Sequence, residues 1–207
     1  MAYLQMPTRG VYAITPSDGR PEALLLKQVE AALKGGIALL QYRDKQASDG
    51  RRRRLATALL ELCRRYNVPL IINDSAALAL AVGAHGVHLG QQDGDVADAR
   101  RQLGRHALVG VTCHASAELA TRAIADGANY VAFGRFFPSI TKAEALPANL
   151  LVLQQPQPVP VVAIGGVTEL NGGILLEHGA NVLAVCEAIF TSGNIRDASL
   201  SLTKLFS

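Results

Sequence analysis

The feature that most constrains the fold is a regular alternation of short β-rich runs with helical segments. Apolar, β-branched runs lie at residues 11–15, 38–44, 69–74, 86–91, 108–114, 130–137, 160–166 and 182–190. Amphipathic stretches such as Glu22 to Lys34 and Ala117 to Ala125 lie between them. Dividing 207 residues among these runs leaves roughly 26 residues each, enough for one strand and one helix. The recurrence of one unit predicts a single domain over residues 1–207.

Glycines stand where the helices are expected to end. They occur in "KGG" at 34–36, "VGAHG" at 82–86, "DGA" at 126–128 and "HGA" at 178–180. Glycine at such positions stops a helix and turns the chain toward the next strand. Alternating units with apolar strands imply a parallel sheet covered by helices. The number of runs favours a closed barrel over an open sheet, and the Gly-rich turn of dinucleotide-binding folds is missing from "ITPSDG" at 14–19. We therefore predict the α/β class and a (β/α)₈ TIM barrel.

Composition and charge exclude several classes of protein. The chain is 49% hydrophobic and 18% charged, so it can bury a large core and is not disordered. The net charge of +3 is too small and too dispersed to indicate a nucleic-acid partner. The densest basic run, Arg51 to Arg54, begins a helix with apolar positions at helical spacing. We expect these arginines on the solvated face, with an acidic partner as the alternative.

The cysteines and the hydropathy pattern predict a soluble cytoplasmic protein. Cys63, Cys113 and Cys186 are too far apart for a metal-ligand motif, and an odd, sparse set is typical of a reduced, intracellular chain. No secretory signal precedes the first expected strand. The longest apolar run, Ala76 to Ala84, is far too short to span a membrane. A homo-oligomer is compatible with the sequence, which does not fix the number of subunits.

Polar residues follow nearly every expected strand, and active sites of this barrel class lie at the carboxyl ends of the strands. In "ALLQYRDK", strand alternation puts Gln41, Arg43 and Lys45 on one face and Tyr42 and Asp44 on the other. The other strand ends carry Asn73, Asp74, Gln91, Gln92, Asp93, Thr112, His114, Ser139, Thr141, Lys142, Gly165, Gly166, Cys186 and Glu187. We expect these side chains to meet at one end of the barrel.

The residue types at these ends indicate an anionic ligand bound with a metal. Asp74 and Asp93 on neighbouring strands suit Mg²⁺, which takes oxygen ligands and shares them with a substrate phosphate. Arg43, Lys45 and Lys142 would give charge-assisted hydrogen bonds to a phosphate or pyrophosphate. "AIGGV" at 163–167, followed by a helix, offers backbone N–H groups for a second phosphate.

Structural roles compete with these interpretations. Asp74 could help to cap the next helix, and Asp93 could belong to a turn. His85 and His88 resemble a metal pair, but residues three apart in a strand point to opposite faces, so we expect no zinc there. The role of His114 stays open between a loop hydrogen bond and catalysis.

Taken together, these motifs resemble the thiamine-phosphate synthase family. The resemblance is carried by "QYRDK" at 41–45, "IIND" at 71–74, "GAHGVHLGQQD" at 83–93, "FGRFFPSITK" at 133–142 and "VVAIGGV" at 161–167. It covers nearly the whole chain with the motifs in family order. It implies a (β/α)₈ barrel that joins a pyrimidine methyl pyrophosphate to a thiazole phosphate and releases pyrophosphate with Mg²⁺.

The resemblance also implies residue roles. Asp74 and Asp93 match the family's Mg²⁺ ligands, and Thr112 stands where the family usually has a serine that contacts the pyrimidine. The expected pyrimidine pyrophosphate site is Gln41, Arg43, Lys45, Asn73, Thr112 and Lys142. The expected thiazole phosphate site is Ser139, Ile140, Thr141, Gly166, Cys186 and Glu187. Glu187 is the largest departure, because it replaces a serine of the family near that phosphate.

The implied chemistry is a dissociative substitution. The C–O bond to pyrophosphate ionises, and the thiazole nitrogen attacks the resulting pyrimidine-stabilised cation. This reaction needs no protein nucleophile, only neutralisation of the leaving group, and Arg43, Lys45 and Lys142 are the expected catalytic cations. The alternatives are a related thiazole-processing isomerase (a tautomerase of the same fold), with His114 as its acid or base, and a non-catalytic sensor of phosphate ligands.

Overall fold

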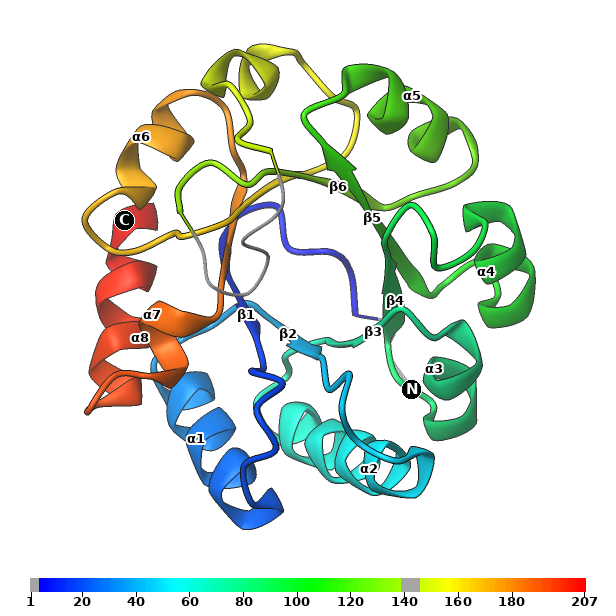
Figure 1. The fold of residues 1–207 in the computed structure, drawn as a ribbon, viewed down its shortest axis with the longest axis vertical. Helices are drawn as coiled ribbons and strands as arrows, with labels where there is room; N and C mark the ends of the chain where they lie inside the picture. The colour runs from blue at the N-terminus through cyan, green and yellow to red at the C-terminus, as the bar shows by residue number, and fades with distance from the viewer. Residues whose placement is uncertain (1–3, 139–145) are drawn as a thin grey trace.

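Eight parallel strands close into a barrel in the computed structural model, which describes residues 4–138 and 146–207 (Figure 1). The strands are β1 (Gly10–Ile14), β2 (Leu39–Tyr42), β3 (Leu70–Asn73), β4 (Gly86–Leu89), β5 (Leu108–His114), β6 (Tyr130–Phe133), β7 (Val161–Ile164) and β8 (Val182–Val185). Each strand pairs in parallel with its neighbours in sequence, and β8 pairs with β1. The predicted (β/α)₈ barrel is confirmed.

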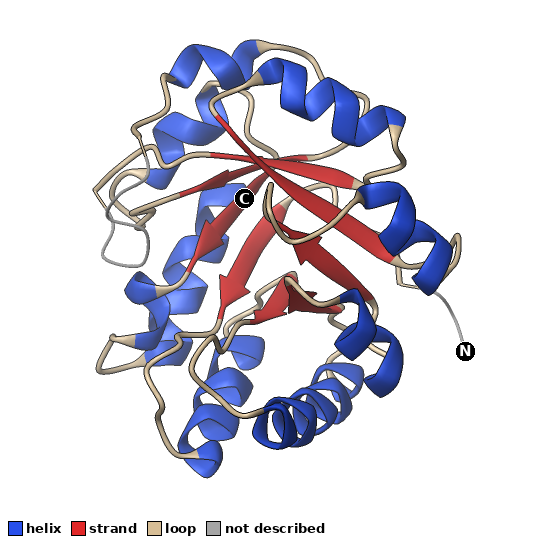
Figure 2. Ribbon diagram, turned by 45° about the vertical axis from the view of Figure 1, so that its right-hand side comes forward, coloured by secondary structure: helices blue, strands red, loops and turns tan. Residues whose placement is uncertain are grey.

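Helices surround the strands on the outside of the barrel (Figure 2). They are α1 (Glu22–Lys34), α2 (Asp49–Arg65), α3 (Ala76–Val82), α4 (Val96–Leu103), α5 (Ala117–Ala125), α6 (Gly172–Glu177), α7 (Glu187–Phe190) and α8 (Ile195–Thr203), with 3₁₀ helices η1 (Leu150–Gln154) and η2 (Lys204–Phe206). The predicted helices α1 and α5 have the expected bounds. Gly83 ends α3 in the left-handed conformation, with a φ of 71°, which glycine adopts without steric cost.

The core has two layers because successive strand residues face opposite ways. On β1, Tyr12 and Ile14 point into the barrel, whereas Val11 and Ala13 pack toward the helices. Both faces of each strand are therefore buried, which explains the continuous apolar runs in the sequence. At the amino ends of the strands, Met6 packs against the interior layer, and the segment before β1 crosses the barrel axis (Figure 1). The amino ends of the strands are therefore covered, and the carboxyl ends are the end of the barrel at which a binding site can form.

A glycine in β5 makes room for a tyrosine of the neighbouring strand. A Cβ added to Gly110 would lie 1.9 Å from Cζ of Tyr130, which is fully buried inside the barrel. We expect Gly110→Ala to lower the free energy of unfolding by about 3 kcal/mol, because neither the strand nor the ring can move freely. Chemical denaturation would measure this loss. Gly173→Ala, with nothing within 4 Å of the added Cβ, is the control. A change below about 0.5 kcal/mol in Gly110→Ala would show that the barrel interior adapts easily.

Six strands are shorter than the sequence predicted, and β6 and β8 are shorter by at least four residues. The run 182–190 was expected as one strand, but β8 ends at Val185 and residues 187–190 form α7. The amides of Ile189 and Phe190 bond back to the carbonyl of Cys186, which starts the helical turn. Short apolar runs do not distinguish strand from helix by themselves. The run 130–137 was also expected as one strand, but β6 ends at Phe133.

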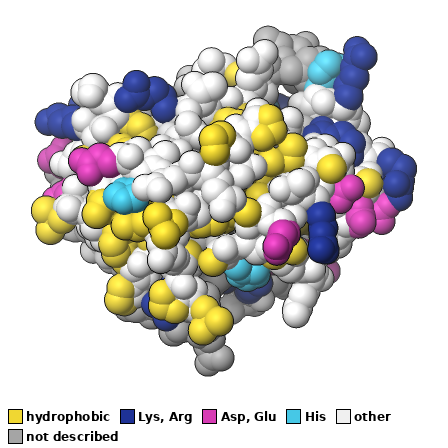
Figure 3. All heavy atoms as spheres, turned by 90° about the horizontal axis from the view of Figure 1, so that it is seen from above, with side chains coloured by type: hydrophobic (Ala, Val, Ile, Leu, Met, Phe, Trp, Pro, Cys, Tyr) yellow, Lys and Arg dark blue, Asp and Glu magenta, His cyan; other side chains and the backbone are white. Residues whose placement is uncertain are grey.

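The basic run at the start of α2 has two different environments. Arg53 and Arg54 are exposed, as predicted for a solvated face. Arg51 instead donates to the carbonyl oxygen of Arg20 at 2.5 Å and lies 3.7 Å from the carboxylate of Asp44. On the face shown in Figure 3, basic and acidic side chains are interspersed among apolar ones. Within residues 4–138 and 146–207, no helix is both long and apolar enough to cross a membrane.

Candidate active site

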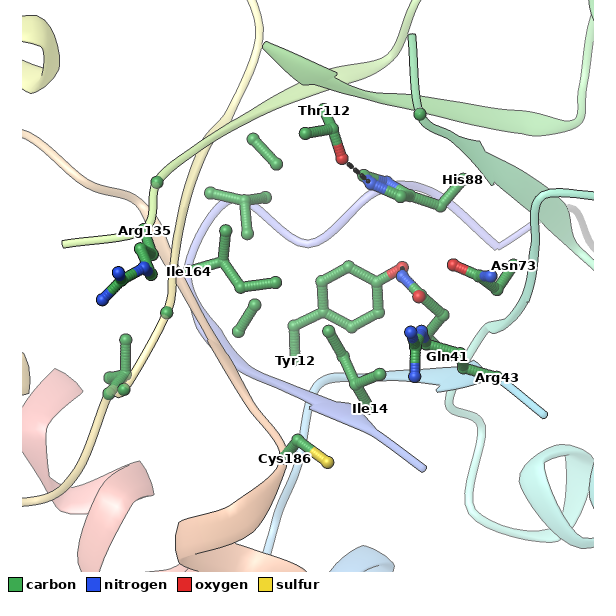
Figure 4. Close-up of a pocket in the computed structure, with 18 of the residues that line it drawn as sticks. Tyr12, Ile14, Gln41, Arg43, Asn73, His88, Thr112, Arg135, Ile164 and Cys186 are labelled. Atoms are coloured by element: carbon green, nitrogen blue, oxygen red, sulfur yellow. Dashed lines mark hydrogen bonds between the residues drawn. The ribbon is translucent and has the colours of Figure 1, made fainter. Parts of the chain in front are cut away.

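A pocket at the carboxyl ends of the strands is lined by residues of all eight strands or of the loops that follow them (Figure 4). Of the predicted site residues, it brings together Gln41, Arg43, Lys45, Asn73, Asp74, Asp93, Thr112, Gly166, Cys186 and Glu187. Ser139, Ile140, Thr141 and Lys142 lie outside the described residues. The strand-end rule therefore placed ten residues from distant parts of the sequence in one cavity.

The end of β2 follows the predicted alternation. Gln41, Arg43 and Lys45 line the pocket, and Tyr42 is buried in the outer layer among the helices. Asp44 also points away from the pocket, since its Oδ1 accepts from the amides of Gln46 and Ala47 at 3.3 and 3.2 Å. The cationic face of β2 is thus directed at the barrel mouth.

The segment that follows β1 fixes the backbone that carries this face. The hydroxyl of Thr15 donates to the carbonyl oxygen of Arg43 at 3.0 Å and accepts from the amide of the same residue at 2.8 Å. Ser17 accepts from the amide of Lys45 at 2.7 Å. Because these bonds satisfy the backbone after β2 has ended, the chain stays extended and both cationic side chains keep their direction toward the pocket.

Asp74 and Asp93 meet at the edge of the pocket. Burial raises the pKa of the Asp93 carboxyl, and the nearby Asp74 raises it further by a hydrogen bond and by like charge. Lys45 Nζ lies 3.1 Å from Asp74 Oδ2, a contact that offsets part of the negative charge. The two carboxylates therefore form one acidic pair beside a cation.

The alternative structural roles were helix capping for Asp74 and a turn for Asp93, and the structure supports only the second. Ser75, not Asp74, caps α3, because its hydroxyl accepts from the amide of Leu78 at 3.1 Å. Asp74 has a φ of 64°, which turns the chain sharply after β3. Asp93 does belong to a turn, where its Oδ2 accepts from the amide of Gly90 at 2.9 Å. Its turn role and its place beside Asp74 are compatible.

The acidic pair fits a hard cation. Mg²⁺ is usually held by one or two carboxylates and completes its octahedron with water and substrate phosphate oxygens. Among the described residues, no group of three or more His, Cys, Asp or Glu side chains could enclose a metal. Two carboxylates that share a hydrogen bond at a pocket edge are a suitable donor set for an ion that a phosphate ligand also coordinates.

Buried polar side chains from five strands form a hydrogen-bond chain, and all of its members except Tyr130 line the pocket. Gln41 Nε2 donates to Tyr12 Oη at 2.7 Å, and the two phenol oxygens of Tyr12 and Tyr130 are 2.9 Å apart. Tyr130 Oη is 3.1 Å from His88 Nδ1. His88 Nε2 is 2.8 Å from Thr112 Oγ1, and Figure 4 marks this contact with a dashed line. The sequence interpretation missed Tyr12, Tyr130 and His88. Their inward position on apolar strands was the available signal, since a polar side chain there must find partners.

The remaining histidines have separate environments. His85 Nδ1 accepts from the amide of Leu70 at 2.9 Å, and His85 does not line the pocket, whereas His88 does. His114 lies at the exposed end of β5 and lines the pocket, with a φ of 51°. Its carbonyl oxygen accepts from the amide of Gly134 at 2.9 Å.

Backbone from β7 and α7 forms the opposite wall. The expected helix N-terminus after "AIGG" is wrong, because α6 begins only at Gly172. A turn intervenes, in which Asn171 donates to the carbonyl oxygen of Gly166 at 3.0 Å and accepts from the amide of Thr168 at 2.7 Å. Glu187 is the first residue of α7, not a strand residue, and it lines the pocket with Cys186.

Cys186 is not poised for covalent chemistry. Burial, with a smaller contribution from the charge of the neighbouring Glu187, raises the pKa of its thiol to about 11. A thiolate is the reactive form of cysteine. Within the described part of the pocket, Cys186 is also the lone cysteine. The site thus offers charged groups, a pair of carboxylates and hydrogen-bonding groups, but no activated thiol among its described residues.

Comparisons with known proteins identify the family of this chain. Residues 11–189 match the family model described as thiamine monophosphate synthase. A thiamine-phosphate synthase of Saccharophagus degradans is 53% identical over 189 residues, which cover 89% of this chain and 87% of that protein. The solved thiamine phosphate pyrophosphorylase of Pyrococcus furiosus is 30% identical with a TM-score of 0.85, over 96% of this chain and 95% of its own.

A more distant solved structure shows only that the fold is widely used. A 3-hexulose-6-phosphate synthase is 16% identical, with a TM-score of 0.74 over 95% of this chain and 99% of its own. Function must therefore be argued from the site and from the closer relatives. The match over most of the sequence and the identity to a thiamine-phosphate synthase show that the chain belongs to the thiamine monophosphate synthase family and is a transferase.

Proposed function

We propose that this pocket condenses 4-amino-2-methyl-5-(diphosphooxymethyl)pyrimidine with a thiazole phosphate to give thiamine phosphate and pyrophosphate. The observation that carries the proposal is the convergence of the acidic pair, Asp74 and Asp93, with the cationic face of β2 in one pocket. A pyrophosphate needs both elements, a metal site and cations that bind its free oxygens. Two small molecules are the partners, with neither nucleic acid nor membrane required.

The β2 cations bind the leaving group. Arg43 presents a planar guanidinium that can take two pyrophosphate oxygens at once, and Lys45 supplies a second charge next to Asp74. Lys142, outside the described residues, is assigned to the same group by the family resemblance. Asp74 and Asp93 would hold Mg²⁺, which when bound neutralises charge on the departing pyrophosphate.

The pyrimidine ring lies deeper, against Gln41, Asn73 and Thr112, which line the pocket beneath the cations. When the C–O bond breaks, its electron pair leaves with pyrophosphate. The lone pair of the thiazole nitrogen then forms the new C–N bond. Holding both substrates in contact is the main contribution of the walls. The protonated thiol of Cys186 takes no part in bond making.

The thiazole phosphate is placed on the β7 and α7 side. Gly166, Cys186 and Glu187 line that side, and Ser139, Ile140 and Thr141 are assigned to it by the resemblance. A Cβ on Gly166 would lie 2.2 Å from the carbonyl oxygen of Pro138. The bare backbone of "GG" therefore packs closely on the loop that follows β6, and its amides are the groups proposed to face the phosphate.

The direct test incubates the protein with both substrates and Mg²⁺ and measures pyrophosphate and thiamine phosphate together. Equal amounts of both products are expected, with none when Mg²⁺ is chelated by EDTA. Binding of both substrates without turnover would favour the sensor. Conversion of a thiazole phosphate alone, without pyrophosphate, would favour the isomerase and give His114 a catalytic role. The acidic pair argues against the isomerase, which has no use for a metal.

We expect Glu187→Ser to change the affinity for thiazole phosphate by less than about threefold, under 1 kcal/mol. Glu187 begins α7, so its backbone N–H can face the phosphate while its carboxylate turns away. The KM for thiazole phosphate measures the effect. Glu169→Ser removes the same charge from an exposed loop outside the pocket and is the control. Binding that becomes tenfold tighter in Glu187→Ser alone would mean that the carboxylate faces the ligand.

A further inference from the structure

Two hydroxyl side chains continue the pairing of β1 with β2 beyond the ends of both strands. The amide of Thr15 still donates to the carbonyl oxygen of Gln41 at 2.9 Å. In the parallel register of β1 and β2, the next bonds would join the amide of residue 43 to the carbonyl of residue 15, and the amide of residue 45 to the carbonyl of residue 17. Instead, the amide of Arg43 donates to Thr15 Oγ1 at 2.8 Å, and the amide of Lys45 donates to Ser17 Oγ at 2.7 Å. Side-chain oxygens thus replace the backbone oxygens of the ladder.

Thr15 replaces two backbone groups at once. Besides accepting from the amide of Arg43, its hydroxyl donates to the carbonyl oxygen of the same residue at 3.0 Å. In a continued ladder, that carbonyl would accept from the amide of residue 17. A hydroxyl has one donor and two acceptor positions, so one side chain can satisfy both groups. The backbone on both sides of the Arg43 Cα is therefore fixed, and with it the direction in which the side chain leaves the chain.

A buried carboxylate orients the hydroxyl of Ser17. Because Ser17 Oγ accepts from the amide of Lys45, its own hydrogen is directed to Oδ1 of Asp44 at 3.5 Å. The Asp44 side chain is 6% exposed and also accepts from the amides of Gln46 and Ala47. One carboxylate therefore holds both the Ser17 hydroxyl and the turn that follows Lys45.

Neither hydroxyl lies where it could touch a ligand in the pocket. Thr15 is 1% exposed, and neither Thr15 nor Ser17 lines the pocket, whereas Arg43 does (Figure 4). An effect of either hydroxyl on ligand binding must therefore pass through the residue whose backbone it holds. Such an effect is expected, because a guanidinium binds two oxygens of an anion only from a defined position and direction.

We propose that Thr15 and Ser17 are positioning residues, which direct the side chains of Arg43 and Lys45 to an anionic ligand by holding their backbones in line with β1. The assignment of that ligand to the pyrophosphate of the pyrimidine substrate rests on the proposed function. Inorganic pyrophosphate is therefore the probe, because it presents the same kind of oxygens and its binding needs no turnover.

Thr15→Val tests the first of these residues, because valine keeps the shape of threonine but makes neither hydrogen bond. We expect the Kd of inorganic pyrophosphate, measured by calorimetry with Mg²⁺ present, to rise about tenfold. Thr15→Ser keeps the hydroxyl and should stay within about twofold of the wild-type protein. An unchanged Kd in Thr15→Val would overturn the proposal, and so would a Thr15→Ser variant that binds as weakly as Thr15→Val.

A double variant separates positioning from a general loss of stability. Thr15→Val leaves the backbone groups of residue 43 without their partners, so it should destabilise the fold whatever side chain stands there. Its effect on pyrophosphate, in contrast, requires the Arg43 side chain. When Arg43→Ala is already present, adding Thr15→Val should change the Kd less than about twofold, while chemical denaturation still shows the loss of stability. An undiminished weakening in that background would mean that Thr15 does not act through Arg43.

Ser17→Ala is an independent variant at a less buried position, where folding is less at risk. We expect the Kd of pyrophosphate to rise about threefold, since one hydrogen bond to the backbone is lost instead of two. The effect should disappear when Lys45→Ala is already present. The same weakening with and without the Lys45 side chain would contradict the role of Ser17.

Thr121→Val is the matched control. Thr121 lies on α5 outside the pocket, and its hydroxyl donates to the carbonyl oxygen of Ala117 at 3.0 Å. The Kd of pyrophosphate should stay within about twofold of the wild-type value. An equal weakening in Thr121→Val and Thr15→Val would show that the pocket responds to the loss of any threonine hydroxyl, which would overturn the proposal.

The proposed function can fail separately from this inference. If the wild-type protein binds pyrophosphate but forms no thiamine phosphate, the proposed function is refuted, and the Kd values still decide the roles of Thr15 and Ser17. If the wild-type protein does not bind pyrophosphate, the positioning proposal is overturned.

Discussion

Asp74→Asn and Asp93→Asn are each expected to lower kcat by roughly 10²-fold or more. Each change removes one carboxylate of the acidic pair and weakens the site proposed for Mg²⁺. Loss of leaving-group neutralisation acts on the transition state more than on substrate binding. Steady-state pyrophosphate release over a range of Mg²⁺ concentrations measures the effect. High Mg²⁺ should partly restore each variant, because a weakened metal site fills at higher concentration.

Asp95→Asn is the matched control for this pair. Asp95 lies two residues after Asp93, and its carboxylate caps α4 by accepting from the amides of Ala97 and Asp98. Asparagine caps helices equally well, so near-normal turnover is expected. Near-normal turnover in Asp74→Asn and Asp93→Asn at low Mg²⁺ would leave these carboxylates with only structural roles.

Arg43→Lys is expected to lower kcat/KM for the pyrimidine pyrophosphate at least tenfold, and Arg43→Ala roughly 10²-fold. Lysine keeps the charge but loses the planar group that binds two oxygens. The KM for the thiazole phosphate should change less than threefold, because Arg43 lies on the pyrophosphate side. Initial rates with each substrate varied in turn would separate the two effects.

Arg51→Lys controls for a general effect of replacing arginine near β2. Arg51 lies near Asp44 and Glu22, outside the pocket, so we expect less than a twofold change in either constant. The observed pairing of Asp44 also removes a rival explanation for Arg43, namely that it serves as a partner of Asp44. A silent Arg43→Lys would show that charge alone, without the planar fork, binds the pyrophosphate.

Local patterns were sufficient to predict the architecture. The alternation of apolar runs with amphipathic helices, and glycines such as Gly83 at helix ends, follow from interactions within a few residues. The strand period of two correctly separated Gln41, Arg43 and Lys45 from Tyr42 and Asp44. The carboxyl ends of the strands meet at one end of a barrel. This rule predicted that ten residues from distant parts of the chain would lie in one pocket.

Boundaries and the competing roles of single residues needed the tertiary structure. Nothing in "DS" at 74–75 shows which residue caps α3. Only the structure shows that Ser75 caps the helix and that Asp74 lies at the pocket beside Lys45. The end of β8 at Val185 is likewise set by a local competition between strand pairing and the turn of α7. The capping residue and the end of the strand both depend on which distant residues lie nearby in the fold. Sequence propensity alone does not identify those distant residues.

The sequence by itself determined the barrel and the polar groups at its mouth, because both follow from short periodic patterns and from one rule of topology. Only the tertiary structure decided the hydrogen-bond chain that runs from Gln41 through Tyr12, Tyr130 and His88 to Thr112. Tyr12 and Tyr130 are 118 residues apart, and His88 and Thr112 are 24 apart. Their contacts require closure of the barrel and the register of its strands, which bring these inward side chains together. Hydrogen bonds between such distant residues leave no local periodicity, so only the folded barrel shows them.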